Sequence, residues 1–421
     1  MMPAPSLREL VSFARERSPY YQELYAGLPQ GVDEPTALPV VDHAAFWAAN
    51  TLRDNRVLTG PLTDASVFKT GGTTGAPKFS CYAREEWREF VTAYGRGMTA
   101  AGLRPDHRVV NAFYAGELYS SFLFTHMSLE HAPVTNVRLP VSGSASPAYT
   151  AAVVEDFDAQ VLATLPTKLC QLADHLLAQG RTLPGVELLL FAGEAFFDDQ
   201  RPLLAKAFPN ARVQSLGCAS VDAGLLGEPV PGDDPSLHRP YHPETLVEIL
   251  DEDTGEPITE PGRAGRLVVT ALTRRLMPVI RYPVGDRAAW SERADGTFRL
   301  AGRSGEGARV SGVTLYTADV RQIIAACDTE GLVTGVQLVA RRRDGRDLLA
   351  LRLATARHEH PPAVLGEAIA AGIRAARPEY DQFVAAGQLH PLEVEWSSHR
   401  DLVVNSRSGK LIGVVDERVA S

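Results

Sequence analysis

The segment from Lys69 to Lys78 reads KTGGTTGAPK and directly follows a short apolar stretch, Ser66–Lys69, that we expect to be a strand. Its glycines let the backbone turn tightly and bring N–H groups against phosphate oxygens. Its threonine hydroxyls add hydrogen-bond donors, and its second lysine adds a mobile positive charge. We predict that this loop binds the phosphates of a nucleotide, through Thr70, Gly71, Gly72, Thr73, Thr74, Gly75 and Lys78.

The loop is not a Walker A motif, because Pro77 stands where that motif has its last glycine. A Gly/Thr-rich surface turn is the alternative interpretation, and the full string after a strand favours the phosphate loop. Gly95-x-Gly97 imitates a dinucleotide fingerprint but lies within a helical pattern. The sequence has no G-x-S-x-G motif of a serine hydrolase.

Outward from the loop, apolar runs of four to seven residues alternate with helical patterns of about a dozen. This alternation predicts an α/β fold with buried, mainly parallel sheets flanked by helices. The expected strands are 66–69, 109–113, 160–163, 186–192 and 211–215, and the expected helices are 7–25 (broken near Pro19), 85–101, 118–129, 167–178 and 199–208.

Beyond Pro229 the chain becomes rich in Gly and Pro, with short β-type pieces at 246–250, 266–270 and 277–281. We expect a β subdomain there that completes the first body. The polar stretch Gly302–Gly307 then separates a C-terminal part with its own strand–helix order. The predicted domains are a large N-terminal domain, 1–302, and a small mobile α+β domain, 303–421.

Composition excludes several classes of protein. The chain has 421 residues and a net charge of −9, which argues against nucleic-acid binding as its main role. No apolar run reaches the length of a membrane span, and the N-terminus lacks a secretory signal pattern. The four cysteines show no C-x-x-C spacing. We expect a cytoplasmic enzyme with a small-molecule substrate and no membrane or nucleic-acid partner; a homodimer stays open.

With the loop, several further motifs in order resemble the adenylate-forming superfamily, and most closely its phenylacetate–CoA ligase branch. They are the N-terminal 7–11 and 18–21, Phe191-Ala192-Gly193-Glu194, Arg281-Tyr282-Pro283-Val284-Gly285-Asp286, Gly302-Arg303-Ser304 and Ser406-Arg407-Ser408-Gly409-Lys410. The resemblance covers nearly the whole chain.

The resemblance implies ATP and Mg²⁺ as cofactors, CoA as a further substrate, and a role for each matched residue. Asp286 would accept hydrogen bonds from the ribose hydroxyls, since a carboxylate has two acceptor oxygens. Arg303, at the hinge, would contact ribose or phosphate, and Lys410 would stabilise charge at the carboxylate and α-phosphate as the catalytic lysine. Gly193, Glu194 and Ser220 complete the implied ATP site. The alternative without a binding role is an ordinary turn residue for Asp286 and a solvated surface side chain for Arg303 and Lys410.

The chain departs from the family at two places. Ser220 takes the place of the family's Mg²⁺-binding Glu, and Asp222 is the carboxylate that could replace it, since Mg²⁺ prefers oxygen ligands. An Asp at a helix start is the alternative for Asp222. Gly305 replaces the acidic hinge residue, which puts the CoA half-reaction in more doubt than adenylation.

The expected acid pocket contains Tyr114, Glu117, Tyr119, Gly217 and Cys218. Phe122, after the same strand as Tyr114, and Phe196 and Phe197, after Glu194, are further aromatic candidates. Aromatic side chains there suit a flat aryl acid, and core packing explains them equally well. Glu117 is unusual beside an anion and could instead meet an amine of the substrate.

Three functions compete at this stage. The first is ATP-dependent adenylation of a small, aromatic carboxylic acid, followed by transfer to CoA. The second keeps the adenylation but passes the activated acid to an amine or another acceptor in natural-product biosynthesis, with nitrite activation for diazotisation as a distant variant. The third is an inactive nucleotide-binding homologue, favoured if Ser220 abolishes Mg²⁺ binding.

Overall fold

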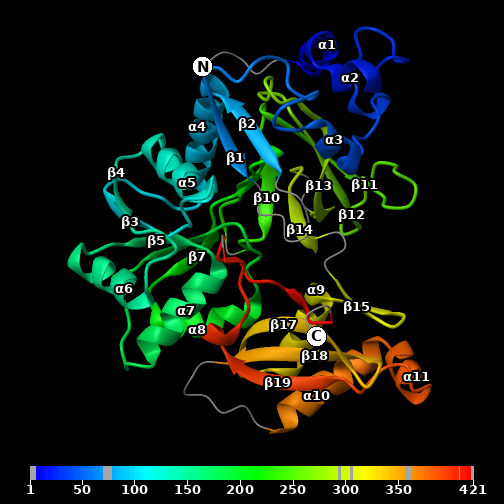
Figure 1. Ribbon diagram of the computed structural model, residues 1–421. Coiled ribbons are helices and arrows are strands. Elements are labelled where there is room, and N and C mark those ends of the chain that lie inside the picture. Colours follow the sequence, from blue (N-terminus) through cyan, green and yellow to red (C-terminus); the bar gives the residue numbers. More distant parts are fainter. Residues whose placement is uncertain are drawn as a thin grey trace. The chain divides into compact units, whose positions relative to one another are not determined.

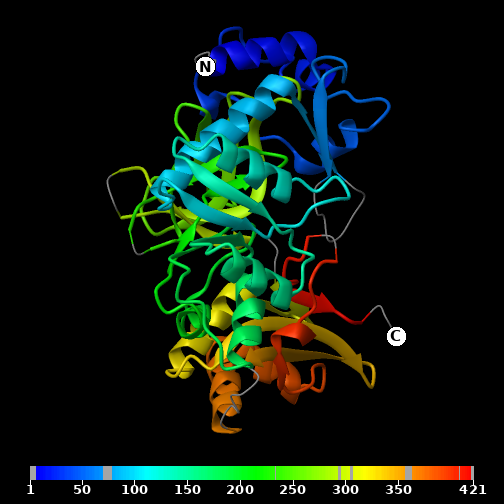
Figure 2. The same ribbon diagram turned by 90° about the vertical axis from the view of Figure 1, so that its left-hand side faces the viewer.

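The computed structural model describes residues 6–69, 78–232, 234–292, 295–303, 307–355, 363–406 and 408–418 (Figures 1 and 2). The chain forms two compact units. Unit 1 comprises Met1–Ser144, Leu190–Gly193 and Val213–Ser304, and unit 2 comprises Ala145–Leu189, Glu194–Arg212 and Gly305–Ser421. The predicted division into independent domains at 302/303 stays a prediction.

The N-terminal helices of unit 1 follow the capping rules. Ser6 starts α1 (Leu7–Arg17) with a capping box, because its hydroxyl accepts from the Glu9 N–H and the Glu9 carboxylate accepts from the Ser6 N–H at 2.7 Å. Pro19 opens α2 (Pro19–Leu24), whose N-cap is Ser18. The predicted break near Pro19 is confirmed.

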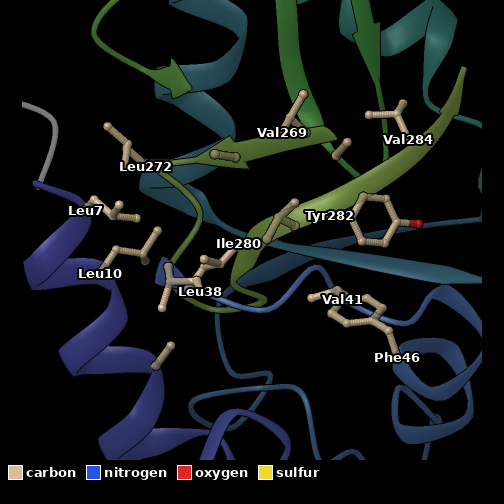
Figure 3. Close-up of a cluster of buried hydrophobic side chains, with 14 of the residues drawn as sticks. Leu7, Leu10, Leu38, Val41, Phe46, Val269, Leu272, Ile280, Tyr282 and Val284 are labelled. Atoms are coloured by element: carbon tan, nitrogen blue, oxygen red, sulfur yellow. The ribbon is translucent and has the colours of Figure 1, made fainter. Parts of the chain in front are cut away.

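A seven-stranded antiparallel sheet forms the main core of unit 1, in the order β11-β12-β13-β14-β10-β9-β8. Leu7 and Leu10 of α1 belong to the same cluster of buried side chains as Val269, Ile280 and Tyr282 of this sheet (Figure 3). The strands are β8 (Cys218–Ser220), β9 (Gly224–Pro229), β10 (Leu237–Pro240), β11 (Thr245–Leu250), β12 (Ala264–Ala271), β13 (Val279–Trp290) and β14 (Phe298–Arg303).

One ion pair in the β13 motif is structural. Arg281 is 6% exposed, its guanidinium donates to Glu248 at 2.8 Å and to the carbonyl of Leu38, and its backbone accepts from the Val41 N–H. A buried ion pair of this kind is costly to break, because the remaining charge would be left without a partner. Arg281 therefore fastens the N-terminal segment to the sheet that carries Tyr282 and Asp286.

The remaining elements of unit 1 precede this sheet in the chain. Strands β3 and β4 pair in parallel, as the α/β prediction requires, whereas β1 and β2 form an antiparallel hairpin. These elements are η1 (Pro35–Ala37), α3 (His43–Ala49), β1 (Ala65–Lys69), β2 (Phe79–Ala83), α4 (Arg84–Ala100), β3 (His107–Asn111), α5 (Ser121–Glu130) and β4 (Asn136–Pro140).

One predicted helix begins later than expected. The pattern predicts a helix from Leu118, but α5 begins at Ser121 because the preceding residues form a tight turn. Glu117 and Leu118 both have positive φ (48° and 64°), and the Tyr119 N–H donates to Gly116 O at 2.8 Å. Non-glycine residues adopt this conformation only where surrounding contacts impose it.

Unit 2 is built around a four-stranded sheet in the order β19-β18-β17-β20, in which β17–β18 is antiparallel and both outer pairs are parallel. Helices α9 and α10 cover one face and share its apolar core; Figure 2 shows the same yellow-to-orange strands and helices after a 90° turn. The elements are β15 (Gly307–Val310), β16 (Val313–Tyr316), α9 (Thr317–Cys327), β17 (Val333–Arg343), β18 (Arg346–Thr355), α10 (Ala363–Ala376), α11 (Glu379–Ala385), β19 (Glu393–Ser398), η3 (His399–Asp401) and β20 (Val414–Asp416).

Unit 2 also contains α6 (Pro147–Asp156), β5 (Val161–Thr164), α7 (Pro166–Leu177), η2 (Asp198–Gln200) and α8 (Arg201–Ala207), and the unit boundary passes through β6 (Leu188–Phe191) and β7 (Arg212–Ser215). The α/β prediction is confirmed by this mixture of helices with parallel strand pairs. None of the helices in the described ranges combines the length and apolar character needed to cross a bilayer.

Two buried histidines should make the stability of this fold sensitive to acid. Burial lowers the pKa of His238 in unit 1 and of His399 in unit 2 from 6.5 to about 4 in each case. Between these two pKa values the unfolded chain binds protons that the folded chain does not. The contribution of each neutral histidine to the free energy of unfolding is therefore fully present above pH 6.5 and is lost as the pH falls towards 4. The loss is on the order of 3 kcal/mol for each histidine.

Urea unfolding between pH 4 and 8 checks this expectation. His238→Gln and His399→Gln keep a hydrogen-bonding group for Ser215 and Thr334, respectively, and remove the titration. Each variant should flatten the dependence of the unfolding free energy on pH. Slopes equal to that of the wild type would show that these histidines do not cause the acid sensitivity.

Candidate active site

The predicted phosphate loop is the segment of chain that connects β1 to β2. Thr70, Gly71, Gly72, Thr73, Thr74 and Gly75 lie outside the described residues, so their predicted role stays a prediction. The hairpin ends that flank them are described: Lys69 pairs with Phe79 in register. Lys78, the last residue of the predicted loop, therefore lies at the start of β2.

Lys78 belongs to a polar and aromatic cluster with two residues of α3. Its Nζ lies 3.2 Å from His43 Nε2 and 5.3 Å from the ring centroid of Trp47. The Trp47 indole N–H also reaches His43 Nε2, at 3.2 Å. Because lysine and indole nitrogens are both donors, His43 Nε2 is the acceptor and the neutral ring carries its proton on Nδ1. Each of these three side chains is half-buried.

The cluster continues through a tyrosine to the predicted metal ligand. The Trp47 N–H donates to the Tyr282 hydroxyl at 2.9 Å, and that hydroxyl donates to Asp222 Oδ2 at 3.0 Å. Burial, and then the Asp222 carboxylate, raise the pKa of Tyr282 well above its ordinary value, so the phenol stays a neutral donor. Lys78 and Asp222 are thus the two ends of one hydrogen-bonded chain inside unit 1.

Asp222 lies in the turn between β8 and β9, so the alternative that it starts a helix is wrong. Its Oδ1 accepts from the Ser220 hydroxyl and, at 3.1 Å, from the Ala223 N–H. Neighbouring backbone is fixed as well, because Tyr82 donates to Val221 O at 2.8 Å. The hydroxyl of Ser220 therefore helps to position the carboxylate of Asp222.

The carboxylate of Asp222 is suited to provide one ligand to a Mg²⁺ ion. Each carboxylate oxygen can accept two hydrogen bonds, and within the described part of the chain Oδ2 accepts one, from the Tyr282 hydroxyl. One lone pair on a hard oxygen is what Mg²⁺ takes from a protein when phosphates and waters supply its other ligands. The described residues contain no group of three or more His, Cys, Asp or Glu that would hold a metal alone.

A second pair of predicted residues meets at β8 and β13. Burial, and then the charge of Asp286, raise the pKa of the Cys218 thiol well above its ordinary value, so Cys218 is a thiol and not a nucleophilic thiolate. Gly217 precedes it with φ +105°, and a Cβ there would meet the Gly227 carbonyl at 2.9 Å. Its own carbonyl accepts from the Tyr94 hydroxyl at 3.0 Å. Gly217 thus permits the close approach of the Gly227 backbone directly before Cys218.

The predicted acid pocket contains the tight turn before α5. Leu118 O accepts from the Lys69 N–H at 2.9 Å, so this turn lies directly beside the start of the phosphate loop. Tyr119 is half-buried and Glu117 is exposed. Tyr114 packs its ring over Gly143, where a Cβ would come within 2.4 Å of it. The turn is therefore well placed for a substrate group, whereas Tyr114 also has a packing role.

Other aromatic residues proposed for the pocket have packing partners. The Phe122 ring stacks on His126 with centroids 6.1 Å apart. In unit 2, Arg201 lies 5.2 Å from the ring centroid of Phe196, and Arg321 lies 4.0 Å from that of Phe197. The alternative of structural packing fits these three residues.

Unit 2 brings two further predicted residues together. Glu194 follows β6 after Gly193, whose φ is +82°. One oxygen of its carboxylate accepts from the Thr167 N–H and hydroxyl, at 3.0 and 2.8 Å, and the other accepts from the Leu411 N–H. Glu194 is thus beside the predicted catalytic Lys410, and its oxygens accept hydrogen bonds from the protein.

In unit 1, Arg303 at the end of β14 pairs through its backbone with Asp286, and its side chain lies outside the described residues.

Sequence reasoning missed His43, Trp47, Tyr282 and Thr167 as parts of the site. Tyr282 stands in the motif that ends at Asp286, so the motif could have indicated that it lies near the site. His43 and Trp47 are four residues apart on a seven-residue helix, far from any motif, and only the fold brings them to Lys78.

Comparison with known proteins finds similarity to several ligases. No known protein-family profile matches it. The phenylacetate–coenzyme A ligase of Thermus thermophilus is 28% identical over 364 residues, which is 82% of this chain and 79% of that protein. The enzyme of the same name from Escherichia coli K12 is 25% identical over 363 residues, 82% of this chain and 80% of that protein.

Solved structures agree on the fold. A 2-hydroxyisobutyryl-CoA ligase in complex with 2-HIB-AMP matches 98% of this chain and 88% of its own, with a TM-score of 0.75 and 19% identity. The motif resemblance, the sequence similarity and the fold point the same way. The chain is therefore a homologue of the phenylacetate–coenzyme A ligases, with the fold of the adenylate-forming superfamily.

Proposed function

We propose that this protein activates a small carboxylic acid with ATP and transfers the acyl group to coenzyme A. In the first step a carboxylate oxygen attacks the α-phosphorus of ATP, the bond to the α,β-bridging oxygen breaks, and pyrophosphate leaves. In the second step the CoA sulfur attacks the acyl carbon, the acyl–phosphate bond breaks and releases AMP, and the thiol proton passes to solvent.

The observation that carries this proposal is the hydrogen-bonded chain from Lys78 to Asp222 in a homologue of acid–CoA ligases. A cation and a carboxylate that share one network of fixed side chains suit a bound triphosphate with its metal. Adenylation needs chiefly positioning and charge neutralisation, which such preorganised groups supply. Asp222 Oδ2 would be the protein ligand of Mg²⁺, which supplies neutralisation of phosphate charge when bound.

The protein's own groups divide the remaining tasks. Lys78 binds phosphate oxygens together with the loop that precedes it, and Asp286 accepts from the ribose hydroxyls beside Cys218. Lys410 stabilises negative charge between the attacking carboxylate and the α-phosphate, and Arg303 contacts ribose or phosphate. Gly193 contributes backbone on the adenine side, and Glu194 acts next to it through hydrogen bonds to protein.

The acid is an aryl acid in this proposal. We assign the acid site to Tyr119 on the turn beside the phosphate loop, to Tyr114 and Glu117, and to Gly217 and Cys218 at the start of β8. Aromatic surfaces bind a flat ring with good geometry at little entropic cost. The name phenylacetate–coenzyme A ligase, shared by the curated relatives, supports the same chemical class.

A different acceptor is the second candidate, because the hinge stretch Gly305-Glu306-Gly307 departs from the family's acidic hinge residue. In that case an amine, or another acceptor, takes the activated acid. One experiment separates the candidates: ATP-dependent pyrophosphate release with aryl acids, aliphatic acids and nitrite, each with and without CoA. Pyrophosphate release, an adenylate trapped by hydroxylamine and a thioester formed with CoA are expected. A trapped adenylate without a thioester identifies the second candidate, and no release with any acid identifies an inactive homologue.

Replacing the predicted catalytic lysine should stop the first step. Lys410→Ala is expected to slow adenylate formation on the order of 10²-fold, the range found when a preorganised electrostatic contact is lost. Rapid-quench measurement of acyl-AMP checks this. Lys206→Ala on α8, an exposed lysine of the same unit, serves as the control and should leave the rate unchanged. An adenylation rate in Lys410→Ala equal to that of the wild type refutes the assigned role.

Replacing the carboxylate at Asp222, or its donor, should change the need for magnesium. Asp222→Asn removes the negative ligand, so the Mg²⁺ concentration for half-maximal adenylation should rise about tenfold or more, and Tyr282→Phe, which removes one orienting hydrogen bond, should raise it by less. Asp54→Asn, at an exposed position of unit 1, is the matched control. A Mg²⁺ dependence that is untouched in Asp222→Asn would make the metal assignment wrong.

A further inference from the structure

A single carboxylate links two distant parts of unit 2. Glu194 is half-buried, and both of its oxygens accept hydrogen bonds from the protein. Oε2 accepts the N–H and the hydroxyl of Thr167, in the first turn of the twelve-residue α7. Oε1 accepts the N–H of Leu411, the residue after Lys410. A negative charge at a helix N-terminus is favourable, so the contacts with α7 fix the orientation of the carboxylate.

The segment on the other side of this contact is organised around Lys410. We define the lysine loop as residues 403–406 and 408–412. Its base is held by Gln337, a fully buried residue of β17 that donates to Val403 O and Ile412 O at 2.8 and 2.7 Å and accepts from the Val403 N–H. Both legs of the loop are therefore attached to the sheet.

The tip of the lysine loop is closed by local hydrogen bonds. Asn405 donates its N–H to Lys410 O at 2.8 Å and accepts from the Gly409 N–H at 2.7 Å. Gly409 has φ +66°, a conformation that glycine adopts without steric cost. Within the residues that the structure describes, Glu194 is the group from outside the loop and its sheet that accepts a hydrogen bond from the backbone next to Lys410.

We propose that Glu194 is a positioning residue for Lys410. Its carboxylate acts through the Leu411 N–H and holds the backbone of the lysine at a fixed place relative to α7. This inference rests on the proposed function, because it gives Lys410 its role in adenylation. It also reassigns Glu194, which the family motif suggested as a direct ATP contact, to a role through another residue.

The physical reason is that a lysine side chain is long and flexible. Its ammonium can be placed to within a fraction of an ångström only if its backbone is fixed, and small misplacements of a catalytic group are costly in rate. A charged acceptor makes a stronger hydrogen bond than a neutral one. The competing interpretation is that Glu194 only caps α7, in which case Leu411 and Lys410 do not depend on it.

Hydrogen exchange at Leu411 distinguishes the two interpretations without any substrate. Glu194→Ala should speed exchange of the Leu411 amide about tenfold or more, and Glu194→Gln by less, because a neutral amide offers one acceptor oxygen for two sets of donors. Thr167→Val is the matched control: it removes the hydroxyl donor on α7 and leaves the carboxylate and its Leu411 contact. Unchanged Leu411 exchange in both Glu194 variants, or equal acceleration in Thr167→Val, overturns the proposal.

The kinetic test uses the two half-reactions. With a proven acid, Glu194→Gln should slow adenylate formation about tenfold, while thioester formation from chemically prepared acyl-AMP stays within about twofold of the wild type. The adenylation defect should vanish in the Lys410→Ala background, since residues that act through one another are not additive. Equal losses in both half-reactions, or full additivity with Lys410→Ala, indicate a merely structural role.

The exchange and kinetic arms keep the two proposals apart. A wild-type protein that forms no adenylate with any acid contradicts the proposed function, and the exchange data then still decide whether Glu194 holds the lysine loop. An active wild type with normal Leu411 exchange in the Glu194 variants contradicts the positioning role alone.

Discussion

The side chain of Tyr282 connects the core of unit 1 to its chemistry. Its ring is fully buried against Phe46 and the strands of the seven-stranded sheet (Figure 3), while its hydroxyl accepts from Trp47 and donates to Asp222. The position of Asp222 is thus set by core packing and not by its own turn alone. Because dense packing allows few side-chain arrangements, the carboxylate is held ready before any ligand arrives.

The two units carry complementary parts of the proposed reaction. In the proposal, unit 1 contributes the residues for phosphate, metal and ribose, namely Lys78, Asp222 and Asp286. Unit 2 holds Lys410, whose loop is fixed by Gln337 below and by Glu194 beside the lysine. In each unit hydroxyl and backbone donors orient a carboxylate, that of Asp222 in unit 1 and that of Glu194 in unit 2. Both units therefore contain a preorganised negative charge.

The sequence predicted the fold class well, because strand and helix periodicities are local properties. It also predicted site roles for Lys78, Asp222 and Lys410, and these roles stay predictions. The start of α5 was missed because the turn at Glu117 and Leu118 is imposed by tertiary contacts against local preference. His43, Trp47 and Thr167 could not be found, since α3 and α7 reach their partners only in the folded chain. The contact of Glu194 with Leu411 could not be found either, because it spans 217 residues.

The most direct test of adenylate formation follows an oxygen atom. An accepted acid carrying ¹⁸O in both carboxylate oxygens is turned over with ATP and CoA, and AMP and pyrophosphate are examined by mass spectrometry. Attack of the carboxylate on the α-phosphorus leaves one ¹⁸O in AMP after thioester formation and none in pyrophosphate. AMP without the label, or ADP and phosphate in its place, would contradict the account.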